Sequence, residues 1–362
     1  MFIQMTYSPF RHIGSVIWKR RPIQFTFFLT RKCNARCPFC FYLSRKNVPP
    51  AAELTLDEVR KVSASLGRLL WLAFSGGEIF LREDLVEITK AFYENNKPAI
   101  ILLPTNGLLT DRIREQTEAI LMQCPKSTVA VKLSLDGPED AHDALRGVPG
   151  AFQKTMNTYE KLRPLLGRYR NFELGINTVF CSANQGRMDE LMTFVRGLEG
   201  IGTHTISLVR GEVAQKGPKE IDIKAYQRTI EKLEANLKND PSGRYRFWGA
   251  RLKAAQDILQ RRLIHDTATK NKRLIPCYAG KLTLVLTETG DLYPCESFTG
   301  RMGNVREWGF DVKKLLTGSD AQAALRAVQQ SGCHCTHECY MMMNILFNPA
   351  LHGSLLREYI RN

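Results

Sequence analysis

Three cysteines close together in the sequence are the residues best suited to metal chemistry. Cys33, Cys37 and Cys40 are spaced as C-x3-C-x2-C. Full ligation of a [4Fe-4S] cluster usually takes four cysteine thiolates, so three leave one iron open. An open metal position is typical of a catalytic site, whereas a structural zinc site usually has two C-x2-C pairs. The spacing therefore favours a catalytic iron–sulfur cluster over a zinc loop or a chance grouping.

A second group of cysteines lies after residue 270. It consists of Cys277, Cys295, Cys333, Cys335 and Cys339. Two fully ligated clusters would need about eight cysteines, so this group favours one additional cluster. A structural zinc site that also uses His334 or His337 is the competing interpretation. Cys124 and Cys181 lie within the expected barrel and are interpreted as buried apolar residues.

The elements that must position these cysteines alternate between strand and helix patterns. Strands rich in β-branched and aromatic residues are expected at 23–30, 69–74, 99–103, 128–135, 172–180 and 204–209. Helical spacing is expected at 55–66, 83–95, 111–122, 152–166 and 188–198, and Thr55 and Glu58 are spaced as a capping box for the first of these helices. Each unit takes about thirty residues, as a parallel βαβ crossover requires. Six units are fewer than the eight of a closed barrel, so we expect an α/β fold with a partial (β/α)6 TIM-like barrel.

Polar residues follow the expected strands at the ends where parallel α/β folds place their sites. Cys33 follows the first strand, and Ser75-Gly76-Gly77-Glu78 follows the second. The third is followed by Thr105-Asn106-Gly107, and the fourth ends at Ser134 and Asp136. Asn177 lies within the fifth. Because these ends meet at one edge of the sheet, the residues are predicted to share one active site.

The chain is expected to divide into four parts. They are a basic N-terminal segment at 1–21, the barrel at 22–210, a helical connection at 211–270 and a small C-terminal iron–sulfur domain at 271–362. Within the last part, apolar runs at 282–286 and 292–293 flank Glu288-Thr289-Gly290-Asp291, which predicts a hairpin. The hairpin would bring Cys277 and Cys295 side by side.

The cysteine loop and the motifs after it resemble those of the radical S-adenosylmethionine enzymes, over about residues 22–209. The resemblance implies that Cys33, Cys37 and Cys40 bind three irons of a [4Fe-4S] cluster. It also implies that the amino and carboxylate groups of S-adenosylmethionine chelate the fourth iron, and that S-adenosylmethionine is cleaved to give a 5′-deoxyadenosyl radical. An enzyme of this type needs an electron donor such as flavodoxin or ferredoxin.

The same resemblance implies contacts to S-adenosylmethionine from several motifs. Phe39 would lie near the adenine, Glu78 would receive the methionine amino group, and Arg146 would pair with its carboxylate. Ser134 would contact the ribose. The full set of implied contacts is Phe39, Gly76, Gly77, Glu78, Ser134, Arg146 and Asn177. The sequence departs from the family at Ile79, where a proline usually follows the Gly-Gly-Glu.

The C-terminal cysteines resemble the SPASM and shorter twitch extensions of that family. Cys277, Gly290 and Cys295 form the element C-x12-G-x4-C. The resemblance implies an auxiliary [4Fe-4S] cluster held by Cys277, Cys295, Cys339 and one of Cys333 and Cys335. It also implies that the enzyme oxidises or crosslinks a peptide. A small-molecule, sugar or lipid substrate is the alternative, and no residue is identified as a substrate-side catalytic group.

Composition limits the other classes of function. The chain has 362 residues, 44% hydrophobic and 24% charged, which is typical of a globular protein. It has no apolar run of the ~18 residues that a membrane span requires, and its start resembles no signal peptide. These features predict a cytoplasmic protein with reduced thiols.

The formal net charge of +15 favours anionic partners. An RNA-modifying radical enzyme is one alternative, but no RNA-binding module is recognisable, so nucleic acid is disfavoured as a partner. A non-enzymatic iron–sulfur electron carrier is another alternative. The segment Trp18-Lys19-Arg20-Arg21 follows the apolar residues 13–17. Such a pattern fits peripheral contact with a membrane surface, but a segment of this kind more often packs on its own domain, and both interpretations stay open.

Overall fold

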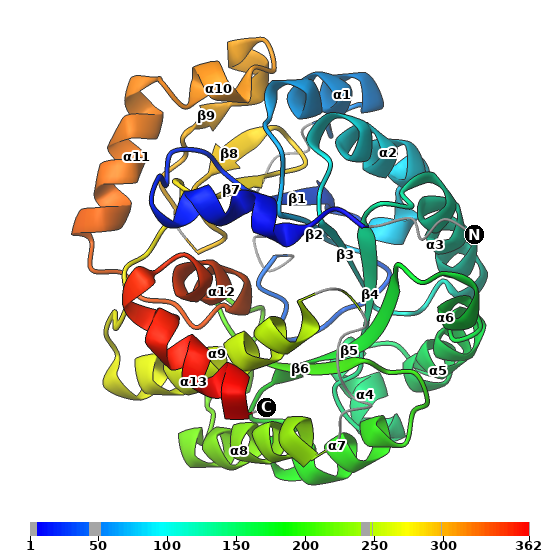
Figure 1. Cartoon of the computed structure of the whole chain (residues 1–362). Coiled ribbons are helices and arrows are strands. Elements are labelled where there is room, and N and C mark those ends of the chain that lie inside the picture. The colour runs from blue at the N-terminus through cyan, green and yellow to red at the C-terminus, as the bar shows by residue number, and fades with distance from the viewer. Residues whose placement is uncertain (1–5, 43–51, 240–246, 248, 298, 362) are drawn as a thin grey trace.

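A nine-stranded, mostly parallel sheet curves through the molecule, as the computed structural model shows (Figure 1). The structure describes residues 6–42, 52–239, 247, 249–297 and 299–361. The strand order is β6-β5-β4-β3-β2-β1-β7-β8-β9. The strands are β1 (Gln24–Thr30), β2 (Trp71–Gly76), β3 (Ile100–Thr105), β4 (Thr128–Ser134), β5 (Phe172–Phe180), β6 (Thr203–Leu208), β7 (Thr283–Leu286), β8 (Asp291–Tyr293) and β9 (Gly303–Asn304).

Helices surround this sheet and alternate with its first six strands (Figure 1). Those between the strands are α1 (Leu56–Ser65), α2 (Leu85–Asn96), α3 (Thr110–Gln123), α4 (Glu139–Arg146), α5 (Ala151–Leu162), α6 (Leu165–Arg168) and α7 (Met188–Arg196). Those after β6 are α8 (Ile223–Asn239), α9 (Ala250–Lys270), α10 (Val312–Leu315), α11 (Ser319–Gln330), α12 (Glu338–Leu346) and α13 (His352–Arg361). A short 3-10 helix, η1 (Pro9–Val16), precedes β1.

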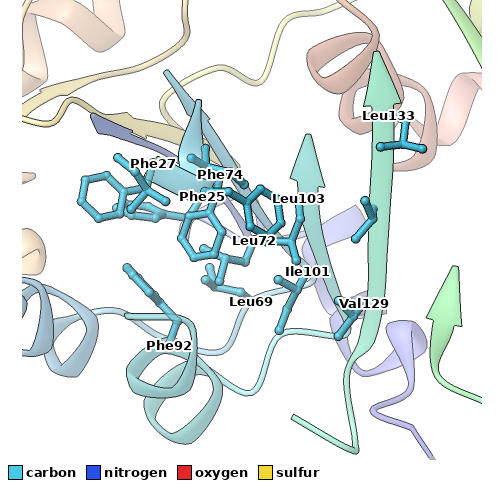
Figure 2. Close-up of a cluster of buried hydrophobic side chains, with 14 of the residues drawn as sticks. Phe25, Phe27, Leu69, Leu72, Phe74, Phe92, Ile101, Leu103, Val129 and Leu133 are labelled. Atoms are coloured by element: carbon cyan, nitrogen blue, oxygen red, sulfur yellow. The ribbon is translucent and has the colours of Figure 1, made fainter. Parts of the chain in front are cut away.

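The core lies between the strands and the outer helices. Figure 2 shows aromatic and aliphatic side chains of β1 to β4 packed together with Phe92 of α2. The rings of Phe25 and Phe92 have centroids 5.7 Å apart, and both side chains are fully buried. Burying such aromatic side chains away from water is a main stabilising contribution to an α/β fold.

The six parallel strands begin and end within about two residues of their predicted bounds, which confirms the α/β fold with a partial barrel. Thr55 and Glu58 make both hydrogen bonds of the predicted capping box at the start of α1. The helix expected at 152–166 is two helices, because the chain turns at Arg163 and Pro164 between α5 and α6. The short helix α4 was not predicted.

The predicted hairpin is confirmed, with β7 and β8 antiparallel around the turn at Glu288. However, β7 also pairs in parallel with β1, where Gln24 lies opposite Thr283. The C-terminal segment therefore extends the barrel sheet. The four domain boundaries stay predictions, and part of the helical connection at 211–270 lies outside the described residues. Among the described helices we find none with the length and apolar character of a membrane span.

Candidate active site

The first cysteine group lies in the loop that leaves β1 at its carboxyl end. Cys33, Cys37 and Cys40 are partly buried, and none forms a disulfide. The Cys40 N–H donates to the Cys37 carbonyl at 3.1 Å, which closes a turn at the end of the loop. Burial raises the pKa of the Cys37 thiol to about 11 and raises that of Cys33 above its ordinary value. A bound cation would be needed to hold these sulfurs as thiolates at neutral pH, which fits a metal-binding donor set.

The two glycines after β2 let the backbone approach this loop closely. The Gly77 N–H donates to the Thr30 carbonyl at 2.8 Å, and the Glu78 N–H donates to the Lys32 carbonyl at 2.9 Å. A Cβ atom on Gly77 would lie 2.0 Å from the Lys32 carbonyl oxygen. Gly76 has φ +112°, a value that favours glycine. The Gly-Gly pair therefore holds the start of the cysteine loop through backbone contacts that a larger residue would prevent.

Helix α4 holds the other side of the loop. The Arg36 N–H donates to the Arg146 carbonyl at 2.8 Å. Gly147 follows with φ +62°, and a Cβ there would lie 2.8 Å from the Arg36 carbonyl oxygen. The C-terminal end of α4 is thereby fixed against the segment between Cys33 and Cys37.

This contact places the Arg146 guanidinium beside the cysteines. Its Nη1 lies 3.7 Å from the Cys37 sulfur, and its Nη2 lies 2.5 Å from a carboxylate oxygen of Asp136. Asp136 is fully buried and accepts a hydrogen bond from the Val179 N–H at 2.9 Å. Among the described residues, the buried Arg146 Nε has no hydrogen-bond partner. A buried N–H donor without a partner would form a favourable hydrogen bond with an anionic group of a bound ligand.

Glu78 is buried in the same region and accepts three hydrogen bonds. They come from the Thr105 hydroxyl at 2.8 Å, the Asn106 N–H at 2.8 Å and the Phe80 N–H at 3.2 Å. Burial is the largest influence and raises the pKa of Glu78 to about 6, although these donors favour the charged form. The Asn106 side chain continues to the loop, where it donates to the Asn34 amide oxygen at 2.7 Å. The carboxyl end of β3 is thus connected to the cysteine loop.

The other predicted cofactor contacts lie along the same edge. Ser134 of β4 and Asn177 of β5 are directly opposite each other in the parallel pairing, and both are partly buried. Ser134 is the last residue of β4 and lies two residues before Asp136, which forms the ion pair with Arg146. Phe39 is buried among apolar residues, and the Arg146 guanidinium lies 5.6 Å from its ring centroid.

The second cysteine group is spread over three segments. Cys277, Cys295, Cys333 and Cys335 line one cavity of about 110 Å³. This confirms that the hairpin brings Cys277 and Cys295 to one place. Cys333 is exposed and receives a hydrogen bond from the Arg273 guanidinium at 3.1 Å. By contrast, burial raises the pKa of the Cys335 thiol to about 11.

Cys339 has a different position, in the first turn of α12. Its N–H donates to the His337 ring nitrogen Nδ1 at 3.2 Å. Within the described residues, no three His, Cys, Asp or Glu side chains are arranged to hold a single metal ion. The ligand set of the auxiliary cluster, and the zinc alternative with His334 or His337, therefore stay predictions.

A cavity of about 730 Å³ borders both cysteine groups. Its lining includes Phe41 and Tyr42, which follow Cys40 directly, and Cys295 and Cys335 of the second group. Its volume is in the range of ligand-binding pockets, and a substrate there would lie near both groups.

Charged side chains at this cavity form a partly buried group. The Glu296 carboxylate lies 2.9 Å from His337 Nε2 and 3.3 Å from the Arg210 guanidinium. Arg210 in turn lies 4.9 Å from the ring centroid of Phe41. The pKa of Glu296 is lowered to about 2 by His337 and Arg210, which outweigh its burial. These pairings hold the polar side chains of Arg210, Glu296 and His337 together at the wall of the cavity.

Comparisons with known proteins agree with this geometry. Residues 27–179 match the model of the Radical SAM superfamily. The chain contains a radical SAM domain. The matched residues extend from β1 into β5 and include the first cysteine loop, Glu78, Ser134, Arg146 and Asn177. A [4Fe-4S] cluster and S-adenosylmethionine are the characteristic cofactors of this domain, and the protein is a radical SAM enzyme.

Two relatives are similar to this chain over most of their length. An AdoMet-dependent heme synthase of Methanosarcina barkeri is 29% identical over 300 residues, which cover 78% of this chain and 79% of the relative. The sporulation killing factor maturation protein SkfB of Bacillus subtilis is 25% identical, covering 90% of this chain and 71% of SkfB. The fold resembles that of Streptococcus suis SuiB bound to precursor peptide SuiA, with a TM-score of 0.60 at 16% identity, covering 88% and 70% of the two chains.

Sequence reasoning missed several residues of this site. Asn106 stood at the correct edge but was not included among the site residues, although an asparagine directly after a strand was a usable signal. Asp136 was placed at the same edge without its partner, because the pairing with Arg146 depends on the unpredicted helix α4. Arg210 and Glu296 were not identified, since nothing in the local sequence of either residue indicates that they meet.

Proposed function

We propose that this radical SAM enzyme abstracts a hydrogen atom from a substrate held in the cavity that borders both of its cysteine groups. When bound, the cluster with S-adenosylmethionine supplies an electron that cleaves the S–C5′ bond, giving a 5′-deoxyadenosyl radical. The observation that carries the proposal is the position of Arg146, whose buried Nε lacks a partner among the described residues while its Nη1 lies beside Cys37.

Each side chain of the first site has a defined task in this proposal. Cys33, Cys37 and Cys40 hold three irons, and Arg146 orients the methionine carboxylate through a charge-assisted hydrogen bond. Glu78 accepts a hydrogen bond from the methionine amino group. Gly76 and Gly77 keep the loop close to β2. Asp136 fixes the guanidinium so that it does not turn away from the site.

The remaining predicted contacts act on the nucleoside half of S-adenosylmethionine. Ser134 and Asn177 lie side by side on β4 and β5, where a ribose hydroxyl would meet two polar side chains. Phe39 would cover the adenine with its apolar ring. These roles are supported by the family's motifs and by the common edge on which the residues lie.

A peptide is the substrate that we propose. SkfB is named as a maturation protein and SuiB was solved with a precursor peptide, so peptide modification occurs among similar proteins. An auxiliary [4Fe-4S] cluster, held by Cys277, Cys295, Cys339 and one of Cys333 and Cys335, would supply an acceptor for the electron that oxidation of the substrate releases. The result is a net two-electron oxidation or a crosslink within the peptide.

A small-molecule substrate is the second candidate. It is favoured by the similarity to heme synthases over 79% of the length of one of them. The cavity also presents Arg210 and Lys219, which would suit the carboxylates of a tetrapyrrole or another acidic molecule. Flavodoxin or ferredoxin as the electron donor stays a prediction, as does contact with a membrane.

Anaerobic reconstitution tests the proposed activity. The protein with both clusters should bind about eight irons per chain and form 5′-deoxyadenosine once reduced. Replacing Cys33, Cys37 and Cys40 with alanine should abolish that product and lower the iron to about four. Cys124→Ala, which removes a buried thiol outside both groups, is the matched control. A reduced protein with full iron that forms no 5′-deoxyadenosine would instead support an electron carrier.

Isotope transfer then distinguishes the two substrate classes. Candidate peptides and tetrapyrroles carrying deuterium at carbon are incubated with the reduced enzyme, and 5′-deoxyadenosine is analysed by mass spectrometry. Transfer of deuterium from a peptide supports the first proposal, whereas transfer from a tetrapyrrole alone contradicts it. Salt-dependent RNA binding with modification of a bound RNA would contradict both.

A further inference from the structure

An apolar groove lies at the end of the barrel opposite the cysteine loop. It has a volume of about 360 Å³, and its floor includes Trp71 and Ile100, the first residues of β2 and β3. Its walls come from η1, the start of α9, the end of α12, and α13. In Figure 1, η1 and α13 lie in front of the strands, at the two ends of the chain. The groove is thus built by both termini and is separate from the 730 Å³ cavity.

Large apolar side chains are exposed on and next to the elements that build this groove. Among the described residues, nine large hydrophobic side chains are exposed, and seven of them lie in η1, in the two residues after it or in α13. The most exposed are Ile17 at 78%, Ile360 at 67%, and Ile13 and Trp18 at 66% each. Such a concentration on one face marks an interaction surface, because exposed apolar residues are otherwise scattered singly.

The charge of the same face is positive. Residues 1–52 contain no Asp or Glu, and α13 contains a single acidic residue, Glu358. Glu358 is buried and pairs with Arg262 at 2.9 Å, so it does not offset the exposed basic residues. These exposed basic residues include Arg20, Arg21, Arg251, Arg357 and Arg361. The apolar groove therefore lies between chain segments that carry exposed basic side chains.

We propose that this face docks on an anionic phospholipid surface. Apolar side chains would enter the boundary between headgroups and acyl chains, while the arginines would contact lipid phosphates. Trp18 is suited to that boundary, where tryptophan is enriched. A second copy of the chain is a poorer occupant, because a symmetric contact would bring the exposed basic side chains of both copies together. The cysteine loop lies at the opposite strand ends, so its cavity would stay open away from the lipid.

Vesicle co-sedimentation of the full chain tests the proposal. We expect binding to vesicles of phosphatidylcholine with phosphatidylglycerol, at least about tenfold weaker binding to phosphatidylcholine alone, and weakening by salt. Arg20→Glu with Arg21→Glu should weaken anionic binding by about tenfold or more. Ile13→Ser with Ile17→Ser should do the same by removing the inserted side chains. Fluorescence of Trp18, isolated by comparison with Trp18→Phe, should shift to shorter wavelength on binding.

Controls on other faces make the result specific. Met122 and Phe194 are exposed apolar residues of α3 and α7, and Met122→Ser with Phe194→Ser should bind vesicles like the wild type. Lys224→Glu with Arg326→Glu, on α8 and α11, is the control for the charge reversal at Arg20 and Arg21 and should also bind like the wild type. Equal loss in these controls, or no preference for anionic vesicles, would overturn the proposal. So would a dimer in sedimentation analysis that the Ile13 and Ile17 substitutions dissociate, or binding of an acidic protein partner in place of lipid.

Discussion

The two cysteine groups differ in what holds them. The first loop is fixed by backbone hydrogen bonds on two sides, from Gly77 to Thr30 and from Arg36 to Arg146. The second group is drawn from three separate segments, and its exposed member Cys333 is held by the side chain of Arg273. Backbone contacts leave a loop little freedom, whereas side-chain contacts can rearrange when a ligand binds. The loop after β1 therefore has less freedom than the segment around Cys333.

Gly77→Ala is the substitution expected to have the largest effect on this comparison. The new Cβ would lie 2.0 Å from the Lys32 carbonyl oxygen, so the loop must move away from β2. A displacement of about 1 Å at a catalytic group can cost about 100-fold in rate, and we expect at least that loss. The measurement is 5′-deoxyadenosine formation by the reduced, reconstituted enzyme.

Gly67→Ala is the control for this substitution, because a Cβ there has no neighbouring atom within 4 Å. It should keep wild-type activity. If Gly77→Ala were also fully active, the backbone contact would not be what positions the first cysteine group.

The second expected effect concerns the auxiliary ligands. We predict that Cys335→Ala loses the auxiliary cluster, so that iron falls from about eight to about four per chain, while Cys333→Ala keeps it. Cys335 is partly buried, whereas Cys333 is exposed and hydrogen-bonded to Arg273. Iron analysis and electron paramagnetic resonance of the reduced proteins distinguish the two variants. The opposite pattern would identify Cys333 as the fourth ligand.

Arg146→Lys should have a moderate effect on the first site. Lysine keeps the positive charge beside Asp136 but loses the planar donor group, including the Nε that has no partner among the described residues. We expect the KM for S-adenosylmethionine to rise about tenfold with the iron content unchanged. Arg187→Lys, at an exposed ion pair, is the control. An unchanged KM would remove Arg146 from the proposed cofactor contacts.

The sequence could predict features that depend on local patterns, but not those that join distant segments. The six strands and the capping box at Thr55 depend on local patterns, and both were predicted. The cysteine loop was also placed correctly, because C-x3-C-x2-C lies within one short segment. Helix α4 was missed because its eight residues are too few for a periodic pattern to stand out.

Features that join distant segments were beyond sequence reasoning. The parallel pairing of β7 with β1 brings together residues separated by about 260 positions, and nothing in either strand specifies its partner. The ion pair between Arg210 and Glu296 is of the same kind. Such contacts are set by tertiary packing, which a local pattern of residue types does not encode.

Glu78 gives a prediction about the pH dependence of stability. Burial raises its pKa to about 6, so the folded chain binds this proton more tightly than the unfolded chain. The resulting stabilisation is complete below the unfolded pKa and is lost as the pH rises through about 6. For a shift of this size the full effect is about 2 kcal/mol, of which about 1 kcal/mol falls between pH 5 and 7.

Denaturant unfolding of cluster-free protein at pH 5 and pH 7 measures this effect by comparison with Glu78→Gln. The wild type should lose about 1 kcal/mol more than the variant between these two values. An equal pH dependence in both proteins would mean that the Thr105 and Asn106 donors keep the pKa of Glu78 near its ordinary value.

Tyr42→Phe tests the contact that joins the two regions and should have the smallest effect. The Tyr42 hydroxyl, just after the first cysteine loop, donates to the buried Glu288 carboxylate in the hairpin turn. The ring stacks on Phe28 with centroids 4.7 Å apart, and phenylalanine keeps this packing. Losing the hydrogen bond leaves Glu288 with Arg31 at 3.9 Å, so we expect unfolding free energy to fall by about 1 kcal/mol. Tyr359→Phe on α13 is the control, and an equal change there would mean that Tyr42 does not couple the cysteine loop to the hairpin.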